Sequence, residues 1–124
     1  MGHFHDGRGE LGRAARWYQR AIDAAPTHAA GYIYLGGLLA RQGKLREAEK
    51  IHRQATETCD EGCLDEAFLN LALVLRAQDR FDEAAVCLRE AIRIDPDYCD
   101  AQTVLRDVER CRRWIRRNRL GTAR

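Results

Sequence analysis

The chain has 124 residues, of which 45% are hydrophobic and 32% are charged, and its formal net charge is +2. This composition is typical of one helical domain that is large enough to bury a core. The N-terminal residues are polar and the longest apolar run, around residues 67–75, is interrupted by Asn70, so we expect no secretory signal, no membrane span and a cytoplasmic location.

Three similar segments follow one another along the chain, at residues 10–26, 44–60 and 80–96, so their starting points are 34 and 36 residues apart. Each has an apolar residue at its second position and two alanines seven residues apart. Small side chains on a helix allow a neighbouring helix to approach closely. The alanine pairs are Ala14/Ala21, Ala48/Ala55 and Ala84/Ala91.

A second kind of segment precedes two of these, at residues 29–43 and 65–79. An aromatic residue and two leucines recur in it at spacings of three and four, which is one face of a helix. A small residue, Gly36 or Ala72, lies on the same face. The repeated unit is therefore a pair of amphipathic helices that pack closely at their small residues.

Turn signals separate the helices. Gly43 and Asp79 are predicted to end the first helix of each pair. Asp95 is predicted to end the second helix of the last pair, because a residue that precedes a proline, here Pro96, disfavours the helical region.

The repeated unit resembles the tetratricopeptide repeat, a helix–turn–helix unit of about 34 residues that stacks into a right-handed solenoid. The segments "YIYLGGLLARQGKLREAE" and "FLNLALVLRAQDRFDEAAVCLREAIRIDP" carry the resemblance. It implies an all-α fold, a right-handed α-solenoid of about two and a half units with a C-terminal capping helix. The expected domain, residues 1–119, comprises a truncated first repeat (1–28), a second repeat (29–64), a third repeat (65–98) and the capping helix (99–119), followed by a basic tail (120–124).

The chain departs from the repeat pattern in two places. Residues 1–9 supply only the end of a first helix, with Gly9 at the turn position equivalent to Gly43 and Asp79. The second repeat has Asp60 where a proline is expected, and two extra residues in "CDEGCL". These extra residues predict a longer loop.

The segment 99–113 aligns with the first helix of a unit, but its polarity differs. Polar residues occupy the positions that would face a second helix, so we expect a capping helix with a polar outer face. The polar positions are Gln102, Arg106 and Glu109, whereas Ala101, Leu105 and Val108 are expected to pack back onto the preceding helix.

The resemblance implies a non-enzymatic protein–protein interaction module or scaffold that binds a peptide or a partner's helix in a concave groove lined by the first helices. Family members that bind chaperones grip a C-terminal carboxylate with lysines, an arginine and asparagines. Here only Asn70 matches, and Ile33, Gly37, Leu69, Asp100 and Val104 replace the rest, so we expect an apolar floor and no such clamp. The expected groove residues are Ile33, Tyr34, Gly37, Arg41, Leu69, Asn70, Leu73, Arg76, Thr103 and Asp107.

The charge distribution supports an alternative function. Residues 110–124 contain seven arginines and no acidic residue, and because the whole chain carries +2, residues 1–109 carry −5. An Arg-rich C-terminal helix could bind an acidic partner or, less in keeping with the rest of the chain, nucleic acid. The basic stripe expected on this helix consists of Arg106, Arg110, Arg113 and Arg117.

The N-terminal edge is a third candidate surface. If no full helix precedes residues 10–24, the face that such a helix would cover stays open, and a second copy or further protein chain could cover it. The residues expected on this face are Ala14, Tyr18 and Ala21.

Motifs for catalysis or cofactors are weak. "GRGELG" at 7–12 has the spacing of a dinucleotide fingerprint, but no predicted strand precedes it. No nucleophile elbow, HExxH or P-loop occurs, so we expect no enzymatic activity and no cofactor. The pair Cys59 and Cys63 in "CDEGC" could form a disulfide or take part in a metal site, and "HFHD" at 3–6 could chelate metal, but neither has the further ligands of a tetrahedral site, so we expect no metal.

Overall fold

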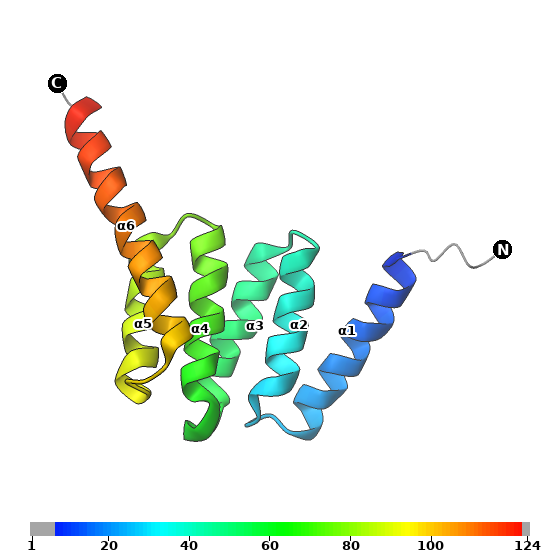
Figure 1. Ribbon diagram of the computed structural model, residues 1–124. Coiled ribbons are helices and arrows are strands. Elements are labelled where there is room, and N and C mark those ends of the chain that lie inside the picture. Colours follow the sequence, from blue (N-terminus) through cyan, green and yellow to red (C-terminus); the bar gives the residue numbers. More distant parts are fainter. Residues whose placement is uncertain (1–6, 123–124) are drawn as a thin grey trace.

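The computed structural model describes the backbone of residues 7–122 and the side chains of residues 9–119. Within that part, the chain forms six helices and no strand, so the all-α prediction is confirmed. Each helix packs against the next one along the chain, and α1 and α6 lie at opposite ends of the row (Figure 1). The helices are α1 (Gly7–Ala24), α2 (Ala29–Arg41), α3 (Leu45–Thr58), α4 (Glu61–Ala77), α5 (Phe81–Ile94) and α6 (Cys99–Thr122).

Two complete helical pairs, α2 with α3 and α4 with α5, make up the centre of the row. The first helices of the two pairs, α2 and α4, also contact each other, so the pairs stack as a solenoid (Figure 1). The core forms two neighbouring clusters, one between α1 and α4 and one between α4 and α6. Helix α6 projects beyond the end of α5 and continues past residue 119 to Thr122 (Figure 1).

The turns inside the pairs end the first helices as predicted. Gly43 has φ of 80° and Asp79 has φ of 61°, both in the left-handed region. In each turn the amide after this residue bonds back to the fifth residue before it: Lys44 N donates to Leu39 O at 2.9 Å, and Arg80 N donates to Leu75 O at 2.9 Å. This pattern satisfies carbonyls at the helix end that would otherwise lack a partner.

The repeated alanines of the complete pairs are buried as expected. Ala48, Ala55, Ala84 and Ala91 have no exposed surface. The alanines of α1 differ, because Ala14 is half-buried and Ala21 is exposed. The difference follows from packing on one side only: α1 contacts α2, and its other face has no helix against it in the described part of the chain.

The closest approach in the first pair places Gly36 of α2 against His52 of α3. A Cβ added at Gly36 would lie 2.3 Å from His52 Nε2 and 2.4 Å from Cε1, well inside van der Waals contact. His52 is 3% exposed, and burial lowers the pKa of its imidazole to about 4. Its Nδ1 is buried without a hydrogen-bond partner among the described residues. The second pair has Ala72 and Leu88 at the equivalent positions, both fully buried.

The junction between the first and second complete pairs corrects the loop prediction. The extra residues of "CDEGCL" lengthen α4 at its N-terminus, which begins at Glu61, and the connection from α3 stays short. Asp60 N donates a hydrogen bond to Thr27 O at 2.9 Å, which ties this turn to the preceding one. A proline at position 60 has no N–H and could not make this bond.

The N-terminal prediction also needs correction. Helix α1 runs without a break from Gly7, so Gly9 is helical and does not form a turn. Gly43 and Asp79 adopt positive φ at the ends of helices, whereas Gly9 lies inside a helix, where a single glycine costs only about 1 kcal/mol relative to alanine. Residues 1–6 of the first-helix end expected at 1–9 lie outside the described residues.

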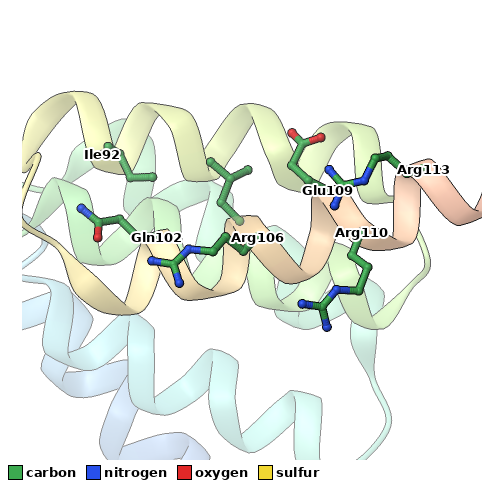
Figure 2. Close-up of a pocket in the computed structure, with 7 residues that line it drawn as sticks. Ile92, Gln102, Arg106, Glu109, Arg110 and Arg113 are labelled. Carbon is green, nitrogen blue, oxygen red and sulfur yellow. The ribbon is translucent and has the colours of Figure 1, made fainter.

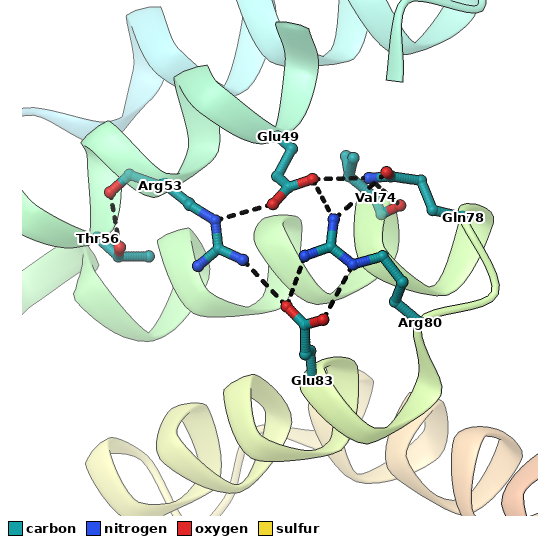
Figure 3. A network of polar contacts seen from close by, with 7 residues as sticks. All are labelled: Glu49, Arg53, Thr56, Val74, Gln78, Arg80 and Glu83. Atoms are coloured by element: carbon teal, nitrogen blue, oxygen red, sulfur yellow. Dashed lines mark hydrogen bonds and ion pairs between the residues drawn. The ribbon is translucent and has the colours of Figure 1, made fainter. Parts of the chain in front are cut away.

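A network of charged residues joins the two pairs on the side of the second helices (Figure 3). Glu49 of α3 accepts hydrogen bonds from Arg53 at 2.9 Å, from Gln78 at 3.0 Å and from Arg80, and Glu83 of α5 pairs with both arginines. Burial raises the pKa of Glu49, but hydrogen bonds from Gln78, Arg53 and Arg80 outweigh it and hold the pKa below its ordinary value. The network therefore favours an ionised Glu49 at the stacking interface.

The Gly36–His52 contact predicts a compensating pair of substitutions. Gly36→Ala alone should lower the free energy of unfolding by about 1–2 kcal/mol, because the overpacking penalty exceeds the gain in helix propensity. Adding His52→Leu recreates the pair found at Ala72 and Leu88 and should restore at least the parental stability. Urea unfolding of the parent, both single variants and the double variant measures the coupling. Additive effects of the two substitutions would contradict the direct contact.

Candidate functional site

The expected groove surface is carried by the first helices α2 and α4, with α6 as a third member. On α2, Tyr34 is 58% exposed, Ile33 is half-buried and Arg41 is exposed. A Cβ at Gly37 would meet nothing within 4 Å, so the surface is open at this point. The α2 part of the predicted groove is therefore accessible, with one large aromatic side chain standing out of it.

The α4 part is less accessible than expected. Leu69 is only 7% exposed and belongs to the core, so it does not form the floor of an open groove. Leu73 is half-buried and packs against the same core cluster. Asn70 Nδ2 donates to the carbonyl oxygen of Glu66 at 2.8 Å, one turn earlier in the same helix. A ligand on α4 would therefore meet the edge of Leu73 and the remaining hydrogen-bonding capacity of Asn70.

The rim of this surface is partly neutralised. Arg76 of α4 forms an ion pair with Asp107 of α6 at 3.1 Å, and Thr103 is exposed nearby on the same helix. Arg41 has no ion-pair partner among residues 9–119. Of the two arginines expected at the groove edge, Arg41 alone keeps its charge available to a ligand.

A stacked tyrosine pair extends the surface onto α1. The rings of Tyr18 and Tyr34 lie 5.4 Å apart, centroid to centroid, at an interplanar angle of 26°. Tyr18 also packs against the core cluster beside Ile22. The prediction that Tyr18 lies on the open N-terminal face is therefore wrong, because it contacts the following helix. Tyr18 was not expected in the groove because only the first helices of the units were expected to line it.

The open face of α1 carries a tryptophan that the sequence pattern did not single out. Trp17 is 67% exposed, and the guanidinium carbon of Arg20 lies 5.6 Å from its ring centroid. Ala21 is exposed and Ala14 is half-buried. An exposed tryptophan next to small apolar residues is a typical composition for a contact surface.

A second candidate surface is a groove between α5 and α6, with a volume of about 490 Å³ (Figure 2). We call it the α5/α6 groove. It brings together three arginines of the predicted basic stripe, whereas Arg117 lies outside it. Its lining residues are Ile92, Gln102, Leu105, Arg106, Glu109, Arg110 and Arg113.

The apolar face of α6 is placed as predicted. Ala101 and Val108 have no exposed surface, and Leu105 packs against the same cluster as these two residues. The opposite face carries Arg106 and Arg110, both exposed. The packing thus fixes which face of α6 is turned to the solvent.

The remaining candidate sites are the cysteine pair, the fingerprint-like stretch and the N-terminal histidines. Burial and the neighbouring Cys63 thiol raise the pKa of Cys59 to about 12, so the Cys59 thiol stays protonated near neutral pH and is a poor nucleophile. Among the described residues, no three His, Cys, Asp or Glu side chains are grouped to hold a metal ion. The fingerprint-like stretch at 7–12 lies inside α1, and "HFHD" at 3–6 lies outside the described residues. No helix within residues 7–122 is both long enough and apolar enough to cross a bilayer.

Known tetratricopeptide repeat proteins resemble this chain in sequence or in fold. Human tetratricopeptide repeat protein 7B is 32% identical over 88 residues, which are 71% of this chain and 10% of that protein. TTC0263, a thermophilic TPR protein of Thermus thermophilus, has a similar fold with a TM-score of 0.69 at 24% identity, over 82% of this chain and 51% of that chain. The first TPR of Spaghetti (RPAP3), bound to an HSP90 peptide, has a TM-score of 0.70 at 18% identity, over 89% of this chain and 86% of that chain.

The chain thus spans a tenth of the human relative and about half of the bacterial protein. The tetratricopeptide repeat family matches residues 27–97, which cover α2 to α5 and more than half of the chain. The chain belongs to the tetratricopeptide repeat family.

Proposed function

We propose that this chain is a non-enzymatic interaction module that binds a peptide or a partner's helix across the surface formed by α1, α2 and α4. The observation that carries the proposal is the stacked pair of Tyr18 and Tyr34, in which Tyr34 is 58% exposed on the side of the first helices. A rigid aromatic side chain that is already held in place loses little entropy on binding and is a frequent anchor of protein interfaces.

The chemistry of the surface favours an apolar ligand. The first TPR of Spaghetti (RPAP3) is bound to an HSP90 peptide, which supports a peptide as the class of ligand. Chaperone-binding members of the family grip a carboxylate with polar side chains at positions that hold Ile33, Gly37 and Leu69 in this chain. We therefore propose an apolar anchor and no carboxylate clamp. Half-buried Ile33 on α2 and Leu73 on α4 suit an aliphatic or aromatic anchor, and Arg41 suits an acidic flank.

A second candidate function is electrostatic binding of an acidic partner by α6. It is favoured by the exposure of Arg106, Arg110 and Arg113, which line one groove. Nucleic acid is a weaker candidate, because no aromatic side chain lines this groove to stack on a base.

We also propose that the open face of α1 contacts a second copy of the chain. Exposed Trp17 and Ala21 and half-buried Ala14 would form the centre of this contact.

The peptide proposal predicts a selective loss of binding. Peptides selected on the parent from a phage-displayed random library should carry aliphatic or aromatic anchors. Their affinity should fall about tenfold for Tyr34→Ala, the loss typical of an interface anchor. Isothermal titration with circular dichroism as the folding check measures this. Val86→Ala on α5 is the matched control, because Val86 is 64% exposed outside this surface. Equal binding by parent and Tyr34→Ala, with loss in Val86→Ala, would place the site elsewhere.

The edge proposal predicts concentration-dependent self-association. Light scattering of the parent should show a rising mean mass as the concentration increases, and Trp17→Glu should remain monomeric with unchanged helicity, because it puts a charge into the apolar contact. A parent that stays monomeric over the whole concentration range would refute the proposal.

A further inference from the structure

The α5/α6 groove occupies a defined position in the repeat. Residues of α6 align with those of α4 at an interval of 34, so the groove lies where α5 packs on α4 one unit earlier. In that unit the equivalent side chains form a tight apolar contact, since Leu71, Ala72 and Leu75 are buried. The groove therefore lies where the second helix of a further unit would pack, and Ile92 and Leu105 are its apolar lining residues.

The side chains around these two residues exclude an apolar helix of the repeat type. Arg106 stands at the position of fully buried Ala72, and Glu109 stands at the position of fully buried Leu75. A helix that approached as closely as α5 approaches α4 would bury both charges against apolar groups, at a high cost in free energy. A helix in this groove must therefore keep its backbone farther from α6 at Arg106, and it must supply polar partners for the charged side chains.

The unmatched charge of the groove is positive. Glu109 is already used inside the fold, because it accepts hydrogen bonds from Arg89 of α5 and, at 3.0 Å, from Arg112. The side chains of Arg106, Arg110 and Arg113 have no ion pair or hydrogen bond with any of residues 9–119. Spacings of four and three place these arginines on one side of α6, over about 10 Å of helix.

We propose that the α5/α6 groove binds an acidic amphipathic helix of a partner protein. The helix presents carboxylates at spacings of three or four residues to Arg106, Arg110 and Arg113, and an aliphatic side chain between them to Ile92 and Leu105. The inference rests on the second candidate function, electrostatic binding of an acidic partner by α6. It is independent of the surface formed by α1, α2 and α4. It differs from that candidate in requiring both charge and an apolar anchor in register.

Nucleic acid fits the same groove poorly. The lining residues contain no aromatic side chain for base stacking, and they include the carboxylate of Glu109, which repels phosphate. An aliphatic floor of Ile92 and Leu105 offers a phosphate backbone nothing, whereas it is the expected contact for a leucine on an amphipathic helix.

The test uses a fluorescent helical peptide of about 18 residues, long enough to form a helix, with glutamates at three- and four-residue spacings around one leucine. Fluorescence anisotropy measures its binding to the full chain. Removing the groove charge in R106Q/R110Q/R113Q should weaken binding about tenfold, as expected for three partly exposed ion pairs. The matched control R13Q/R16Q/R20Q removes the same charge from α1, at the other end of the solenoid, and should bind like the parent.

Two further ligands separate the explanations. A peptide with the leucine replaced by serine should bind at least about fivefold more weakly, as expected for loss of a buried aliphatic anchor. If the serine peptide bound as tightly as the leucine peptide, the result would agree with purely electrostatic binding by α6. It would contradict the proposal that the α5/α6 groove binds an amphipathic helix. Equal weakening by the α1 control, tighter binding of a single-stranded RNA of equal charge, or no binding of the acidic peptide to the parent would each overturn the proposal as well.

Discussion

The contact between a small residue on the first helix and a larger side chain on the second holds each unit together. In the first complete pair Gly36 leaves room for the imidazole of His52, and in the second Ala72 and Leu88 take the same positions. Only a missing or minimal side chain lets the helix axes come this close. The turn geometry at Gly43 and Asp79 then becomes possible, since it joins two helices that already lie side by side.

The residue at this repeat position also differs between the two complete pairs and α6, which carries the α5/α6 groove. Where a second helix packs, the position holds Gly36 or Ala72; where no helix of the described chain packs, it holds Arg106. A long cation there is incompatible with close helix packing and compatible with an acidic ligand. The tyrosine surface has a different origin, because Tyr34 points away from the pair and is held by Tyr18 of the preceding helix.

Much of the fold follows from the sequence, because repeated spacings report directly on helix faces and turns. The complete pairs, the buried alanines and the apolar face of α6 were predicted from such spacings. The incorrect predictions concern places where a helix lacks a neighbour on one side or where a single contact determines the local structure. Gly9 lies inside α1, which tolerates a single glycine, and the extra residues before Cys63 extend α4. Tyr18 was assigned to the wrong face because its partner lies in another helix.

Several contributing residues carry no sequence signal of their own. His52 reads as a polar residue on a charged helix, and its burial follows only from the space above Gly36. The hydrogen bonds of Glu49 connect α3 to the turn between α4 and α5 and depend on side-chain positions that periodicity does not fix. The charges of Arg106, Arg110 and Arg113 stay unmatched because Glu109, the acidic residue in the same groove, pairs with Arg89 and Arg112.

The protonation of His52 tests the close packing most directly. Because burial lowers its pKa from 6.5 to about 4, the folded state binds fewer protons than the unfolded state between these values, and stability should fall as the pH drops from 6.5 towards 4. An NMR titration of the His52 ring proton, assigned by its absence in His52→Leu, measures this pKa in the folded protein. We predict an apparent pKa near 4. A pKa at or above the ordinary value of 6.5 would show that water reaches the imidazole and would contradict the close packing of the pair.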